Sequence, residues 1–176
     1  MSPGLGRGPP SPDGPDCRIT MRSTTVQPEG YMPVRQICSR VVATAWPAET
    51  IRAAACRMAE LEVGTLVVVD AEGSSQPLGI VTDRDIAIRC VAGRLNPDRM
   101  PISAVMTTPV QSIDADASMD DAISRMAIAA TRRLVVTGEG HGVVGILSLD
   151  DVLRLFIDEA ASIGHLLERQ APSIPA

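Results

Sequence analysis

The sequence predicts an α/β (α+β) protein made of two pseudo-symmetric β-α-β-β-α units packed sheet to sheet. A segment at residues 79–86, G-I-V-T-D-R-D-I, returns at residues 145–152 as G-I-L-S-L-D-D-V. A shift of 68 residues also places the R-M-A of residues 57–59 on the R-M-A of residues 125–127. The central strand expected in each unit is aliphatic on both faces, so each sheet needs cover on both sides. An internal repeat of this length indicates a duplicated structural unit.

The composition fits one domain of ordinary size, or two small ones that share a core. Of the 176 residues 45% are hydrophobic but only 2% are aromatic, so the core must consist of Val, Ile, Leu, Ala and Met. The net charge of −5 and the lack of a Lys/Arg run argue against a nucleic-acid partner. No apolar run approaches the roughly 20 residues of a membrane span, and no secretory signal is recognisable. We therefore expect a cytoplasmic protein with no membrane partner.

The first unit begins with a short helical segment at residues 34–39 and a brief strand at 41–45. A helix is expected to begin near Thr50 and to end at Gly64. Its apolar positions recur at helical spacing and predict one buried stripe: Ile51, Ala54, Ala55, Met58 and Leu61.

The first unit then continues with two strands and a second helix. Strands are expected at residues 65–69 and 78–82, separated by a turn rich in Gly and Ser at 71–76. The helix covers residues 83–91 and is closed by Gly93.

The second unit repeats this order. Its turn at residues 138–142 is two residues shorter than the first one, which reduces the shift from 68 to 66. A length change confined to a turn is where an insertion should fall. The first helix of this unit starts at Ser118, and the acidic Asp120 and Asp121 suit its first turn. Its expected buried residues are Met119, Ala122, Ile123 and Met126.

These patterns divide the chain into four parts. Residues 1–31 are rich in Pro, Gly and Ser and lack periodicity, so we expect a disordered tail. Residues 32–96 form the first unit and residues 97–157 the second. Residues 158–176 form a C-terminal tail with a helical pattern.

The four cysteines are scattered: Cys17, Cys38, Cys56 and Cys90. Neither a C-x-x-C motif nor a nearby His pair accompanies them, so we predict no metal site. In a cytoplasmic protein free thiols are expected, and a redox-linked pairing of two of them is the alternative.

Each repeated corner places a hydroxyl residue at a strand-to-helix junction and an aspartate three positions later: Thr82 with Asp85, and Ser148 with Asp151. This spacing suits a capping box, in which the hydroxyl accepts from the N3 amide while the carboxylate reaches back to the N-cap. It also suits a ligand site, because a carboxylate can accept from two vicinal hydroxyls and a helix N-terminus offers N–H groups to an anion. The residues alone leave both roles open.

The tandem of units, each ending in G-hydrophobic-hydrophobic-[ST]-x-x-D, resembles the cystathionine β-synthase (CBS) domain pair, also called a Bateman module. The resemblance covers residue 33 to about residue 156. Two further motifs carry it, V-M-T-T-P-V at residues 105–110 and R-R-L-V-V at residues 132–136. Residues 82–97 look especially like the stand-alone bacterial CBS-pair proteins of the hypoxic response protein type.

The resemblance implies a ligand class and a set of site residues. CBS pairs often bind adenosine-containing ligands (AMP, ADP, ATP or S-adenosylmethionine) in two clefts between the halves, and we expect no required cofactor. By this resemblance Asp85 and Asp151 accept from ribose hydroxyls, with Thr82 and Ser148 beside them. Adenine packs against aliphatic strand residues, and a basic pair meets phosphate. The matching aliphatic residues lie around residues 43–45 and 111–113, with Ala45 and Ile113 among them, and the basic pair is Arg132 and Arg133.

The two clefts are not expected to be equivalent. The second half has a basic pair before its central strand, where the first half has Gly64 and Thr65, which supply no positive charge. We therefore expect a nucleotide to favour the cleft of Ser148, Asp151 and Arg133.

The resulting hypothesis is a regulatory module that binds an adenine nucleotide and signals through an effector protein or through self-association as a homodimer. The alternative is a ligand-free stress-response or interaction module, redox-responsive through Cys38, Cys56 or Cys90. We do not expect an enzyme, because neither His141 nor His165 can be placed beside a nucleophile from its spacing.

Overall fold

The computed structural model describes residues 32–70 and 75–170. The tail predicted for residues 1–31, most of the turn at 71–76 and the end of the C-terminal tail lie outside the described residues.

Both halves follow the predicted order of elements. The first half contains η1 (Val34–Gln36), β1 (Thr44–Ala45), α1 (Ile51–Glu60), β2 (Thr65–Val69), β3 (Pro77–Thr82), α2 (Asp83–Asp85) and η2 (Ile86–Val91). The second half contains η3 (Ile102–Ala104), β4 (Ser112–Asp114), α3 (Met119–Ile128), β5 (Arg133–Thr137), η4 (Glu139–His141), β6 (Val143–Ser148) and α4 (Leu149–Gln170). The strands predicted at residues 65–69 and 78–82 are confirmed, whereas the one predicted at 41–45 is reduced to two residues.

Each half forms a three-stranded sheet with its aliphatic strand in the middle. The orders are β1-β2-β3 and β4-β5-β6, and in each sheet the first pair is parallel and the second antiparallel. The registers correspond: Thr65 lies opposite Thr82 as Arg133 lies opposite Ser148. This correspondence confirms the predicted pseudo-symmetry.

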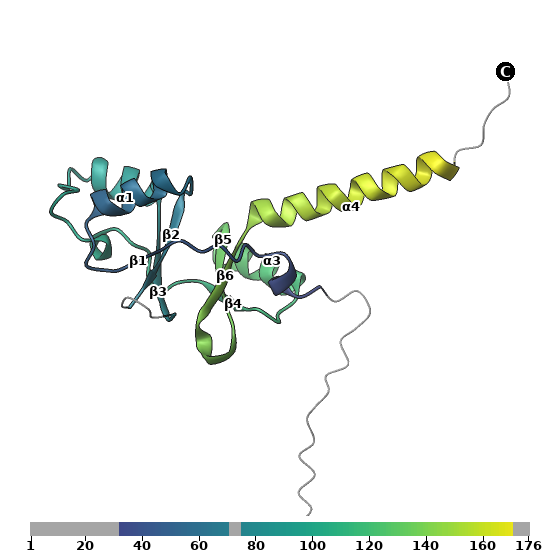
Figure 1. Cartoon of the computed structure of the whole chain (residues 1–176), viewed down its shortest axis with the longest axis horizontal. Helices are drawn as coiled ribbons and strands as arrows, with labels where there is room; N and C mark the ends of the chain where they lie inside the picture. Colours follow the sequence, from purple (N-terminus) through teal and green to yellow (C-terminus); the bar gives the residue numbers. More distant parts are fainter. Residues whose placement is uncertain (1–31, 71–74, 171–176) are drawn as a thin grey trace, which may run out of the picture.

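The two sheets pack against each other, as predicted. Val67 and Val69 of β2 and Val135 of β5 are at most 2% exposed and form a shared layer. α1 and α3 lie on opposite outer sides of the paired sheets (Figure 1). Side chains on both faces of β2 and β5 are thereby buried, which explains their uninterrupted aliphatic sequence.

The leading segment of each half crosses over to the core of the other half. Val34 in η1 is fully buried in the second core, and its N–H donates to the Ala117 carbonyl at 2.9 Å. Ile102 in η3 is fully buried in the first core, and its N–H donates to the Glu49 carbonyl at 2.8 Å. This exchange ties the halves together, so each core is completed by residues from the other repeat.

The predicted end of the first helix is wrong by four residues. α1 ends at Glu60, and Glu62 adopts the left-handed conformation with φ 53°. The Val63 N–H then donates to the Met58 carbonyl at 2.9 Å, which is a Schellman termination without glycine. Ala130 repeats this conformation after α3 with φ 49°. Leu61, predicted to be buried, is 53% exposed because it lies at this helix end.

The two corner helices differ more than the sequence predicts. The helix expected over residues 83–91 is a single α-turn followed by the π-helix η2, and its left-handed end residue is Arg94, not Gly93. Gly93 is needed because a Cβ there would meet the Arg89 carbonyl. In the second half α4 is one continuous helix of 22 residues that passes through the expected boundary at residue 157. No helix of the described residues has the length and apolar character needed to cross a membrane.

Candidate functional site

Both repeated corners form capping boxes. At the start of α4, the Ser148 N–H and hydroxyl donate to Asp151 Oδ2 at 2.8 and 2.6 Å, and the Asp151 N–H donates to Ser148 Oγ at 3.2 Å. Thr82 and Asp85 repeat this geometry at 3.0, 2.7 and 3.1 Å. The capping role is therefore realised at each corner, and each aspartate uses only one carboxylate oxygen for it.

The second carboxylate oxygen of Asp85 is already engaged. Arg89 Nη2 lies 3.3 Å from Asp85 Oδ1, one turn further along the chain. The same guanidinium donates through Nη1 to the carbonyls of Val105 and Met106 at 2.7 and 3.0 Å. The first corner is thus used to hold the segment that leads into the second half.

The second carboxylate oxygen of Asp151 has no such partner. The repeat shift of 66 places Leu155 where the first half has Arg89, so α4 supplies no cation at this point. Within residues 32–70 and 75–170, only Oδ2 of this carboxylate accepts hydrogen bonds, and no ion pair involves Asp151. Oδ1 therefore remains an available acceptor.

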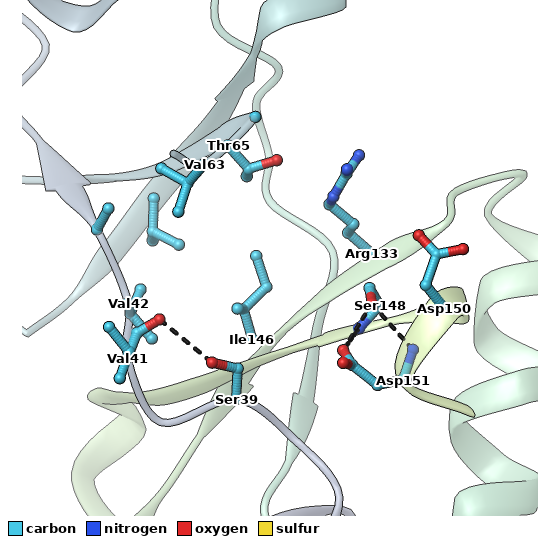
Figure 2. A pocket seen from close by; sticks show the side chains of 13 residues that line it. Ser39, Val41, Val42, Val63, Thr65, Arg133, Ile146, Ser148, Asp150 and Asp151 are labelled. Carbon is cyan, nitrogen blue, oxygen red and sulfur yellow. Dashed lines mark hydrogen bonds between the residues drawn. The ribbon is translucent and has the colours of Figure 1, made fainter. Parts of the chain in front are cut away.

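A cavity of about 250 Å³ opens at the second corner between the two halves. The second half contributes Arg133, Ser148, Asp150 and Asp151 to its lining. The first half contributes an aliphatic wall from the segment before β1 and the start of β2, namely Val42, Ala43, Val63, Gly64 and Thr65. Figure 2 shows these two sets of side chains facing each other across the cavity. The site thus combines polar groups at one side with an apolar wall at the other.

Two polar groups in the cavity lack partners among the described residues. Arg133 lies opposite Ser148 across β5 and β6, and its half-buried guanidinium makes no ion pair there. The hydroxyl of Thr65 is buried without a hydrogen-bond partner. Both side chains extend into the same space (Figure 2). A cation without an ion-pair partner in a cavity favours an anionic ligand.

The structure separates the predicted site residues into groups. It brings Ser148, Asp151 and Arg133 together at the cavity, whereas Arg132 is directed outward and lies 3.5 Å from Asp150 with its side chain 70% exposed. Ala45 is 1% exposed in the first core, and that core rather than the cavity is where its side chain packs.

Ile113 is similarly 4% exposed in the second core. The first half contributes aliphatic contacts from the segment just before β1, Val41 to Ala43, and the central part of β6 adds Ile146. Of the stretches expected to hold adenine, residues 43–45 reach the cavity through Ala43, whereas none of residues 111–113 lines it. The sequence analysis missed Val42, and it did not predict that Thr65 lines the cavity. The repeat contained a signal for Thr65, since the shift of 68 aligns it with Arg133.

The three cysteines that the structure describes differ in their surroundings. Burial raises the pKa of the Cys38 thiol, and the Asp151 carboxylate adds to this while Arg40 opposes it. Cys56 is exposed and Cys90 is buried, and both line a groove between α1 and η2. The described part of the chain holds no group of three His, Cys, Asp or Glu residues that could bind a metal ion.

The sequence matches the family profile of the CBS domain twice, at residues 34–91 and 102–158. The chain therefore belongs to the CBS domain family, as its repeated corner indicated. It is 38% identical over 120 residues to the CBS domain-containing protein YhcV of Bacillus subtilis, covering 68% of this chain and 81% of YhcV. It is 30% identical over 122 residues to the uncharacterized protein MK0525 of Methanopyrus kandleri, of which the match spans only 61%.

Solved structures of the family share the fold. Hypoxic response protein I, a Mycobacterium tuberculosis protein solved with two coordinated zinc ions, matches with a TM-score of 0.62 and 30% identity over 70% of this chain and 98% of that one. The CBS domain protein PAE2072 of Pyrobaculum aerophilum, solved in complex with AMP, matches with a TM-score of 0.65 and 26% identity over 74% and 99%. The predicted likeness to stand-alone CBS-pair proteins is confirmed.

Proposed function

We propose that this chain is a regulatory CBS-pair module that binds an adenine nucleotide in the cavity at the Ser148–Asp151 corner. The observation that carries the proposal is the meeting of three groups in one cavity. They are an aspartate with a spare carboxylate oxygen, an unpaired arginine and an aliphatic wall from the other half.

Each group suits one part of the ligand. Asp151 Oδ1 would accept from the ribose hydroxyls while Oδ2 keeps the helix cap. Arg133 would meet the phosphate, helped by the N-terminus of α4. Val42 and Ala43 would pack against the adenine ring. The AMP complex of PAE2072, a related CBS protein, supports this class of ligand.

The signal of the module would be a change in how its two halves pack. A ligand that binds one arrangement of the two halves better than another shifts the population toward that arrangement. Because the cavity is lined by both halves, an occupied site would change how they pack. We propose that this change is transmitted by self-association or by contact with an effector protein.

The test is a thermal unfolding series with AMP, ADP, ATP and S-adenosylmethionine. A ligand that binds only the folded state should raise the melting temperature by several degrees at saturating concentration. Arg133→Gln should remove most of the increase for the phosphate-bearing ligands. Arg132→Gln, the neighbouring arginine outside the cavity, is the matched control and should keep it. No increase with any of the four ligands would reject nucleotide binding.

The competing hypothesis is a ligand-free, redox-responsive module. The raised pKa of Cys38 disfavours it at that residue, because the reactive thiolate is depleted. Cys56 and Cys90, which line one groove, are the pair to examine. If the module is not redox-responsive, a non-reducing gel after mild oxidation should show no intramolecular disulfide between them.

A further inference from the structure

The distal part of α4 is an exposed helix with a row of large apolar side chains. α4 begins at the cavity corner and is anchored in the second core by Val152, which is 1% exposed. From Phe156 to Leu167 every residue except Gly164 is exposed. Figure 1 shows this part of the helix projecting away from both sheets. Six large apolar side chains on the helix are 46–67% exposed, namely Leu153, Phe156, Ile157, Ile163, Leu166 and Leu167.

The apolar residues follow a coiled-coil period. Leu149, Leu153, Phe156, Ala160, Ile163 and Leu167 are separated by alternating steps of four and three residues. Steps of this kind place side chains along one narrow seam, where each can insert between four residues of a facing helix of the same period. Below, the seam means the exposed members from Leu153 to Leu167.

Most charged and polar residues lie away from the seam, and Glu159 is the charged residue at a flanking position. Arg154, Asp158 and Ser162 occupy heptad positions on the outer face of α4 and are all exposed. The positions that flank the seam are mainly apolar, with Ile157 and Leu166 widening it. A paired helix would therefore bury the seam without burying a charge on the outer face.

The chemistry of α4 argues for a protein partner over a membrane surface. Interfacial helices that bind anionic lipid carry Lys and Arg on their polar face. From residue 153 to residue 170 the helix has no Lys, its two Arg (154 and 169) are outnumbered by three acidic residues (158, 159 and 168), and the chain as a whole has a net charge of −5. A membrane would therefore gain little electrostatic attraction for this helix.

We propose that the seam of α4 pairs with the same seam of a second copy of this chain. A seam of constant period is complementary to itself, which is what a two-fold symmetric dimer requires. The six large apolar side chains of the seam and its flanks each expose on the order of 100 Å², so one copy offers about 600 Å². A pair would then bury about 1,200 Å², which reaches the lower bound for a specific interface. The proposal deepens the self-association part of the proposed function and does not depend on nucleotide binding.

The test is sedimentation velocity on the full chain from 1 to 100 μM. We expect the wild type to form a dimer and Ile163→Glu to raise its dissociation constant at least tenfold. Ser162→Glu adds the same charge one residue away on the outer face and should leave the dissociation constant within about twofold. Because residue 163 is 58% exposed, the variant should melt at the wild-type temperature at a concentration where both are monomeric.

Three outcomes would overturn the proposal. They are a monomeric wild type at 100 μM, a dimer unaffected by Ile163→Glu, and equal weakening by Ile163→Glu and Ser162→Glu. AMP titration of the Ile163→Glu variant separates this proposal from nucleotide binding. A variant that keeps AMP affinity but no longer dimerises supports both proposals, whereas a wild-type dimer that does not bind AMP contradicts only the nucleotide site.

Discussion

The two repeated corners have the same cap but different surroundings. At the first corner the remaining oxygen of Asp85 is held by Arg89, which also fastens the carbonyls of residues 105 and 106. At the second corner the corresponding position is Leu155, and the remaining oxygen of Asp151 faces a cavity that contains Arg133. A duplicated motif has thus been used once to join the halves and once to leave an acceptor available.

This difference shows why a motif alone identifies the fold better than it identifies a site. The hydroxyl and aspartate form the cap in both halves, so their presence reports only the strand-to-helix corner. What distinguishes the corners lies four residues further on, where one helix has an arginine and the other a leucine. The binding hypothesis therefore depends on residues outside the motif.

The largest expected effect concerns the two equivalent glycines at the start of each repeated corner, Gly79 and Gly145. A Cβ at Gly79 would lie 2.8 Å from the Thr107 carbonyl oxygen, and one at Gly145 would lie 2.9 Å from the Ser39 carbonyl oxygen. Gly79→Ala and Gly145→Ala should each lower the free energy of unfolding by about 1–3 kcal/mol, because the crossing backbone must shift. Gly164→Ala is the control, since nothing lies within 4 Å of its Cβ. Chemical denaturation measures all three.

If only one of these two substitutions lowered the free energy of unfolding, the two crossing segments would not be equivalent. Gly145→Ala should also weaken AMP binding, because Ser39 lines the cavity. Gly79→Ala should not.

The next effect concerns the joint at the first corner. Arg89→Leu converts this position to the residue of the second half and removes hydrogen bonds to two backbone carbonyls. We expect a loss of about 1 kcal/mol in the free energy of unfolding, with AMP affinity unchanged. Arg84→Leu, at an exposed position in the same corner, is the control and should be near neutral. Equal stability of the two variants would show that the Arg89 contacts do not hold the halves together.

The smallest effect concerns the reactivity of the thiols of Cys38 and Cys56. A raised pKa means that the Cys38 thiol holds its proton to higher pH than an ordinary cysteine, so its thiolate fraction near pH 7.5 is reduced. Alkylation followed by peptide mass spectrometry should modify the exposed Cys56 first. The rate at Cys38 should rise at a higher pH than that of a cysteine in a short peptide, because the pKa of its thiol is raised. Faster modification of Cys38 at pH 7.5 would contradict the burial of its thiol.

The fold was largely predictable because its signals are local and occur twice. The apolar spacing of α1 predicted the burial of Ile51, Ala54 and Met58, and the aliphatic strand at residues 65–69 predicted a central position. The misplaced end of α1 has a physical cause. A hydrogen-bonded Schellman turn forms there with Glu62, a residue that rarely adopts positive φ.

The site was only partly predictable because it depends on contacts between distant segments. The roles assigned to Ala45 and Ile113 rested on strand position, but the packing of both side chains in the cores is a tertiary property. The ion pair of Asp85 with Arg89 has the i, i+4 spacing of an ordinary helix, but the bonds from Arg89 to the carbonyls of residues 105 and 106 span 16 and 17 positions of the chain, which no sequence period indicated.

The central claim is that the second corner binds the nucleotide and the first does not. Its most direct test is calorimetric titration of AMP into the wild type, Asp151→Asn and Asp85→Asn. We predict one site per chain, with affinity lowered roughly 10- to 100-fold by Asp151→Asn, as for a lost hydrogen bond to a charged group, and unchanged by Asp85→Asn. Two sites per chain, or equal losses in the two variants, would contradict the claim.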